Sequence, residues 1–143
     1  MSCKINFFSE NITFAPKSKG KLRNWICSVV EMEGRVPGEF NFIFCDDEYL
    51  MQLNYKYLKH RTLTDIITFP VEDENSTLCG DIFISIPRVK ENAGKFNQTT
   101  ADELHRVMIH GILHLAGYHD KSKQEKEEMR RKENHYLEAR LFT

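Results

Sequence analysis

The chain lacks the features that mark several large classes of protein. It has no run of 18 apolar residues, which excludes a membrane-spanning helix. Its first segment, Met1 to Phe14, alternates polar and apolar residues and has no apolar core of a secretory signal. Lys and Arg total 20 against 21 Asp and Glu, a net charge of -1, which excludes a general polycation. Any contact with nucleic acid therefore needs a local basic patch, and no membrane partner is expected.

Cysteine is scarce and irregularly placed. The four cysteines are Cys3, Cys27, Cys45 and Cys79, and no CxxC pair occurs. Disulfide and cysteine–zinc interpretations therefore have little support from spacing. We expect reduced thiols in a cytoplasmic protein, although Cys3 could pair in principle.

The order of the predicted elements indicates an α+β fold in one domain, residues 1–143. A length of 143 residues suits a single domain of about 100–150 residues. Alternating apolar residues predict strands over 5–14, 40–44, 65–69 and 81–86, with the phenylalanines of the second strand and Trp25 in the core. Helices are predicted over 19–34, 46–57, 87–94, 100–117 and 122–141. Strands precede most helices, so we expect helices packed on a small sheet.

Two sequences typical of a capping box begin the last two predicted helices. Thr100 and Glu103 stand three residues apart, as do Ser122 and Glu125. The charges over 121–140 alternate in sign, which indicates a solvated helix face, with the inner side formed by Met129, Tyr136, Leu137 and Leu141.

A histidine pair on the penultimate helix carries the strongest chemical signal. His110 and His114 stand four apart, so their side chains share one helical face and both can reach one zinc ion. Gly117 allows the chain to double back, and Asp120 then follows at the spacing of a third ligand. Three protein ligands leave a fourth position for water, which is typical of a catalytic zinc site.

Histidines four apart also occur on ordinary helices, where they bind nothing. Here the neighbours Ile109, Ile112 and Leu113 are apolar, so unsatisfied histidines would be costly. Zinc peptidases carry a glutamate directly after the first histidine as general base, and this chain has Gly111 there. Peptide hydrolysis by that mechanism is therefore disfavoured, and a general base must come from elsewhere.

These residues resemble the YbeY family of bacterial endoribonucleases, whose signature is H-G-x-L-H-L-x-G-Y-D-H. Residues 110–118 fit that signature, residues 63–70 are similar to the family's P-T-D-V-L-S-F-P strand, and residues 79–85 are similar to its L-G-D-I-x-I-S strand. The resemblance implies a mixed four-stranded sheet with helices, one zinc ion held by three signature residues, and metal-dependent cleavage of single-stranded RNA. It also implies a role in ribosomal RNA maturation, at the end of the small-subunit RNA, and in ribosome quality control.

The chain departs from the family pattern at the end of the signature. The family ends in Asp then His, whereas this chain has His119 then Asp120. Asp120 occupies the third ligand position by spacing, and a carboxylate oxygen binds zinc acceptably. A shift of one residue in the turn would bring in His119 instead, so both remain open, with Asp120 preferred.

A second departure concerns a functional arginine that the family carries before its T-D strand. Leu58 stands at the aligned position here. The predicted RNA-binding residues lie close by and are Lys56, Lys59 and Arg61. Two of them, Lys59 and Arg61, are also candidate catalytic groups that offset charge on the phosphorane. A solvated basic turn explains the same residues without any RNA.

The sequence therefore predicts a zinc-dependent endoribonuclease, a hydrolase that cleaves phosphodiester bonds. The attacking group, metal-bound water or the RNA's own 2′-hydroxyl, stays open, as do the oligomeric state and a divalent ion other than zinc. Two alternatives are a non-catalytic RNA-binding factor of ribosome assembly with a structural zinc, and a zinc hydrolase of another substrate.

Overall fold

A four-stranded mixed sheet forms the centre of the protein. The computed structural model describes residues 3–60, 63–73 and 75–142. The strands are β1 (Lys4–Ser9), β2 (Pro37–Cys45), β3 (Ile66–Val71) and β4 (Leu78–Ser85), in the spatial order β1-β2-β4-β3. β1, β2 and β4 run parallel, whereas β3 is antiparallel to β4. The predicted α+β class and the mixed sheet are confirmed.

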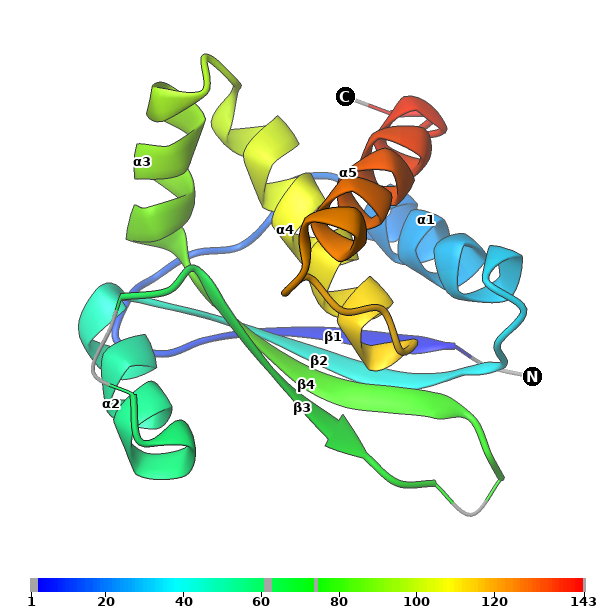
Figure 1. Cartoon of the computed structure of the whole chain (residues 1–143), viewed down its shortest axis with the longest axis horizontal. Coiled ribbons are helices and arrows are strands. Elements are labelled where there is room, and N and C mark those ends of the chain that lie inside the picture. The colour runs from blue at the N-terminus through cyan, green and yellow to red at the C-terminus, as the bar shows by residue number, and fades with distance from the viewer. Residues whose placement is uncertain (1–2, 61–62, 74, 143) are drawn as a thin grey trace.

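Helices cover both faces of the sheet unequally. The helices are α1 (Lys19–Met32), α2 (Asp47–Leu58), α3 (Ile86–Lys95), α4 (Thr100–Leu115) and α5 (Lys123–Glu138). α1, α3, α4 and α5 lie on one side of the sheet, and α2 lies on the other (Figure 1). The larger core fills the first side, and a smaller cluster of Cys45, Leu50 and Ile67 packs under α2.

Local sequence signals explain where the helices begin. Asp46 caps α2 by accepting a hydrogen bond from the Tyr49 backbone N–H, and Ser122 forms the predicted capping box with Glu125. The predicted cap of α4 was one residue off, because the side chain of Thr99 rather than Thr100 accepts from the Asp102 N–H.

Burial agrees with the predicted core in β2 and α1. The side chains of Phe40, Phe42 and Phe44 are fully buried, as alternation along a strand with one covered face predicts. Trp25 is buried as well, and its indole N–H donates to the Tyr136 carbonyl of α5 at 3.0 Å. Trp25 therefore fixes α5 against α1 and is part of the core.

The prediction for the last helix was wrong at two residues. Leu141 is 97% exposed, because α5 ends at Glu138 and the chain beyond it leaves the core. Glu133 belongs to the charged run expected to face solvent, yet it is only 4% exposed. Its burial has consequences for the site described below.

The expectation of reduced thiols was also wrong for one pair. Cys3 and Cys27 form a disulfide, with their Cα atoms 6.1 Å apart. The pairing arises because the segment entering β1 runs beside α1, a neighbourhood that the spacing of cysteines along the chain does not reveal. Cys45 and Cys79 are free thiols. Within residues 3–60, 63–73 and 75–142, no helix is long and apolar enough to cross a membrane.

Candidate metal centre

The amphipathic character of α4 positions the two histidines. One side of this helix is packed into the core, where Met108, Ile109 and Ile112 are fully buried. His110 and His114 lie at the margin of that buried side, and their side chains are 21% and 26% exposed, respectively. Their rings are 4.5 Å apart between centroids. The core therefore holds the helix rigidly while the imidazoles remain accessible from outside.

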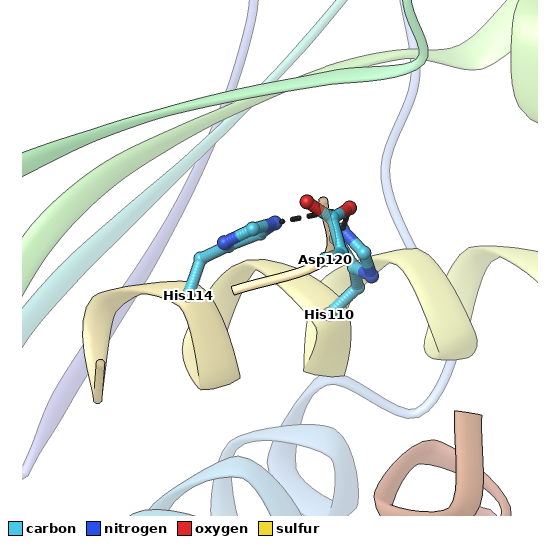
Figure 2. A group of neighbouring side chains, drawn as sticks. All are labelled: His110, His114 and Asp120. Carbon is cyan, nitrogen blue, oxygen red and sulfur yellow. Dashed lines mark ion pairs between the residues drawn. The ribbon is translucent and has the colours of Figure 1, made fainter. Parts of the chain in front are cut away.

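The turn after α4 brings Asp120 back to both histidines. Gly117 adopts a left-handed conformation with φ of 111°, which reverses the chain as the sequence predicts. Figure 2 shows the Asp120 carboxylate between the two imidazoles, with Oδ2 at 3.2 Å from His110 Nε2 and 3.5 Å from His114 Nε2. The donor atoms of all three residues lie within 4.8 Å of one another, so this group could hold a metal ion.

Two of the spacings between these donor atoms are compatible with a zinc-type site. Bonds of about 2.0–2.2 Å in a tetrahedron place neighbouring ligand atoms about 3.3 Å apart. The two distances from Asp120 Oδ2, 3.2 and 3.5 Å, bracket that value. Two imidazole nitrogens and one carboxylate oxygen also form a donor set of the kind found in catalytic zinc sites.

The structure brings Asp120, and not His119, to the histidine pair. His119 is exposed, whereas Asp120 is half-buried between the two rings. The turn is held from the other side by Tyr118, whose hydroxyl donates to Glu33 Oε1 at 2.6 Å. This geometry favours Asp120 as the third ligand, in agreement with its spacing.

The two histidines differ in their electrostatic surroundings. Burial opposes protonation of His110, but the hydrogen bond and charge of Glu133, together with Asp120, outweigh burial and raise its pKa. Burial lowers the pKa of His114, and the neighbouring His110 lowers it further. The pair therefore contains one imidazole, His110, that is hydrogen-bonded to a carboxylate, and one, His114, that favours the neutral form.

Two clefts meet at His110 and Asp120. The α2-side cleft is lined by Leu58, His60, Thr64, Ile66, Thr68 and His114, among others, and the α5-side cleft by Phe96, Glu103, Arg106, Lys126, Arg130 and Glu133. Asp65, His110 and Asp120 line both. Their volumes of about 490 and 380 Å³ fall within the range of ligand sites.

Asp65 is a site residue that the sequence analysis did not single out. It stands directly before β3 and lines both clefts beside His110. Burial raises its pKa above the usual range for aspartate. The signal in the sequence that could have found it is its place in the strand motif over 63–70.

The predicted basic residues do not line the two clefts as a group. Lys56 and Lys59 lie at the end of α2, where each is exposed and placed over a tyrosine ring. Arg61 lies outside the residues that the structure describes. His60 and Leu58 supply the wall of the α2-side cleft in this segment. Arg106, Lys126 and Arg130 line the opposite cleft and were missed, because they are dispersed over two helices in a run of mixed charge.

Gly111 shows why a peptidase glutamate has no place in this helix. A Cβ atom at this position would lie 2.9 Å from Ile66 Cδ1 and 3.0 Å from Ile82 Cγ2. The position therefore faces β3 and β4 rather than the histidine pair. A longer side chain here would have to displace the side chains of Ile66 and Ile82.

Comparison with known proteins identifies the family. The model of the family described as Endoribonuclease YbeY matches residues 4–140. The chain belongs to the YbeY family. It is 52% identical to the Endoribonuclease YbeY of Christiangramia forsetii over 91% of this chain and 90% of that protein. It is 46% identical to the Endoribonuclease YbeY of Cytophaga hutchinsonii over 96% of both chains.

A solved structure shares the fold of this YbeY family member. The solution structure of the protein TM1509 from Thermotoga maritima aligns with a TM-score of 0.62 and 32% identity, over 94% of this chain and 87% of that one. The predicted family is confirmed, and so is the predicted enzyme class, since the relatives are named endoribonucleases, hydrolases that cleave RNA phosphodiester bonds.

Proposed function

We propose that this chain is a zinc-dependent endoribonuclease that cleaves single-stranded RNA in the maturation and quality control of ribosomal RNA. The observation that supports this proposal is the His110, His114 and Asp120 group, placed where two clefts meet. One zinc ion per chain is held by these three residues and supplies Lewis-acid chemistry for phosphodiester cleavage. Residues 1–143 act as one hydrolase domain in this proposal.

The substrate strand crosses the histidine pair from one cleft to the other. Lys56 and Lys59, at the end of α2, and Arg61, which lies outside the described residues, contact its phosphates in this proposal, and Lys59 and Arg61 offset charge that develops on the reacting phosphate. Lys126 and Arg130 extend this contact on the α5 side, where both are exposed and, among the described residues, neither forms an ion pair with a carboxylate. An exposed Phe96 in the same cleft offers a face for an unpaired base.

The proposed partners are single-stranded RNA, ribosomal RNA and the small ribosomal subunit, and the proposed place is the cytoplasm. In a reducing cytoplasm the Cys3–Cys27 pair is expected as two free thiols rather than as the disulfide. Fractionation of cells with a thiol-trapping reagent tests this part of the proposal separately from the activity.

Cleavage of an end-labelled single-stranded RNA tests the activity. We compare the wild-type protein with His114→Ala and with His119→Ala, a matched control that removes an exposed neighbouring imidazole. The proposal is supported if the wild type and the control cleave the RNA and His114→Ala does not. Wild-type cleavage should also disappear when a chelator removes the metal and return when zinc is added. Equal cleavage by all three proteins indicates a contaminating nuclease, and RNA binding without cleavage supports an assembly factor.

Two further measurements refine the mechanism and the RNA path. A 2′,3′-cyclic phosphate at the product ends identifies attack by the RNA's own 2′-hydroxyl. RNA affinity is then measured as a function of salt concentration, in the His114→Ala protein so that the RNA is not cleaved. One variant of that protein also carries Lys56→Gln and Lys59→Gln, and a second carries Lys126→Gln and Arg130→Gln. Removal of one phosphate contact reduces the magnitude of the slope of log K against log salt by about 0.7, so an unchanged slope excludes that pair.

A further inference from the structure

A carboxylate is buried on the otherwise charged and solvated surface of α5. Glu133 is 4% exposed, while its neighbours along the helix, Lys126, Glu127, Arg130 and Asn134, are exposed. An unpaired buried carboxylate is costly, so its partners explain why it is there. Oε2 lies 2.7 Å from His110 Nδ1, and Oε1 accepts from Arg106 Nη1 at 3.0 Å.

The contact with His110 determines which ring nitrogen faces the ligand group. A carboxylate accepts only, so Nδ1 donates to Glu133; in the neutral ring Nε2 then carries the lone pair, and Nε2 is the atom 3.2 Å from Asp120 Oδ2. His114 is held differently, since its hydrogen-bond partner besides Asp120 is the backbone of Tyr118. His110 is therefore the member of the pair whose tautomer a carboxylate fixes.

Arg106 anchors that carboxylate from the same helix as His110. Residues 106 and 110 stand one turn apart on α4, so both reach one point on α5. Arg106 Nη2 also donates to Asn134 Oδ1 at 2.8 Å, which makes a second attachment to α5. Rotation of the Glu133 carboxylate is thus restricted at both oxygens.

We propose that Glu133 is a positioning residue of the metal centre, which fixes the tautomer and ring orientation of His110 and strengthens Nε2 as a metal ligand. This inference rests on the proposed function, because it concerns the same metal centre. Hydrogen-bond partners behind a metal-bound histidine contribute about 10–100-fold to metal affinity or activity. α5 then belongs to the active site although it supplies none of the three ligands.

A purely structural role makes a different prediction. If Glu133 only attaches α5 to α4, its replacement lowers the stability of the metal-free protein and leaves zinc affinity unchanged. If Glu133 positions His110, zinc affinity falls in a protein that is still folded. Metal affinity and metal-free stability therefore have to be measured on the same variants.

The test compares Glu133→Gln with Glu127→Gln, which makes the same change at an exposed position of α5. Glutamine keeps the volume and one oxygen acceptor but removes the charge. The zinc Kd is measured by competition with a chromophoric chelator, and folding of the metal-free proteins by near-ultraviolet circular dichroism. We expect a Kd about 10–100-fold above wild type for Glu133→Gln, and a Kd within about twofold of wild type for Glu127→Gln.

The outcomes separate this inference from the proposed function. A folded Glu133→Gln protein with wild-type zinc affinity overturns the role of Glu133 and leaves zinc-dependent RNA cleavage by the wild type untouched. A wild-type protein without zinc-dependent cleavage refutes the proposed function, and one that binds no zinc refutes both. If Glu133→Gln does not fold, nitrogen-15 spectra of zinc-loaded wild type decide: a proton on His110 Nδ1 and zinc on Nε2 support the inference, and zinc on Nδ1 overturns it.

Discussion

The buried histidine His105 makes the stability of the fold depend on pH. Its ring is 6% exposed and lies between Trp25 and Phe142, with centroid distances of 5.7 and 5.5 Å. Nδ1 accepts a hydrogen bond from Arg140 Nη1 at 2.7 Å, and Arg140 is itself paired with Asp102 at 3.0 Å. Burial, and then the charge of Arg140, lower the pKa of His105 from 6.5 to about 4.

The sign and size of the effect follow from proton linkage. Between pH 6.5 and pH 4 the unfolded chain binds a proton at His105 that the folded protein does not bind. The free energy of unfolding therefore falls as the pH is lowered through this window, and this contribution is constant above it. Lowering the pH from 7.5 to 4.5 removes about 2.5 kcal/mol through this one group, as an upper limit.

Urea unfolding of wild type and His105→Gln at pH 7.5 and 4.5, in chelator, measures this contribution. Glutamine cannot titrate and keeps an acceptor for Arg140. The loss of unfolding free energy between pH 7.5 and pH 4.5 should therefore be about 2.5 kcal/mol smaller in His105→Gln than in the wild type. His135→Gln, at an exposed position of α5, serves as the control and should keep the wild-type dependence. Equal pH dependence in wild type and His105→Gln would refute the reasoning.

Three further outcomes follow from the structure. Asp120→Ala should raise the zinc Kd about 10²–10⁴-fold, since three or four ligands share a binding free energy of about 10–16 kcal/mol, about 2.5–5 kcal/mol each. His119→Ala should leave the Kd unchanged, and the reverse result in chelator competition makes His119 the ligand. Reduction of the Cys3–Cys27 disulfide, which closes a loop with a sequence separation of 24, should lower the free energy of unfolding by about 3.5 kcal/mol. An unchanged urea midpoint contradicts this. Gly111→Glu should lower the melting temperature without peptidase activity, because the position faces the sheet; cleavage of a peptide library contradicts this.

Features set by nearby residues could be predicted from the sequence. The histidine pair depends on helical spacing, and the return of Asp120 depends on a glycine three residues after His114. The capping of α5 by Ser122 is local in the same way. Each of these needs information from one segment of about ten residues, which explains why the candidate ligands can be found without knowledge of the fold.

Features made by segments far apart in the chain were missed. Glu133 is 23 residues from His110, and its charge makes it look like one more solvated residue of α5. Asp65 reaches the site only because β3 lies beside α4 in the assembled sheet and helix layers. The Cys3–Cys27 pairing likewise depends on how β1 and α1 pack. No spacing rule along the chain encodes such neighbourhoods.

The turn that carries Asp120, the candidate third ligand, is held by contacts with the end of α1 and with α5. Glu33, just after α1, accepts hydrogen bonds from Tyr118 at 2.6 Å, from Lys132 at 3.1 Å and from Tyr136. Its carboxylate is 5% exposed, so these bonds are shielded from water and restrain Tyr118 strongly. With Tyr118 fixed to α1 and α5, the backbone of the turn is set two residues before Asp120. Contacts with distant segments therefore place Asp120 at the histidine pair, whereas the spacing after Gly117 alone leaves both His119 and Asp120 open as ligand candidates.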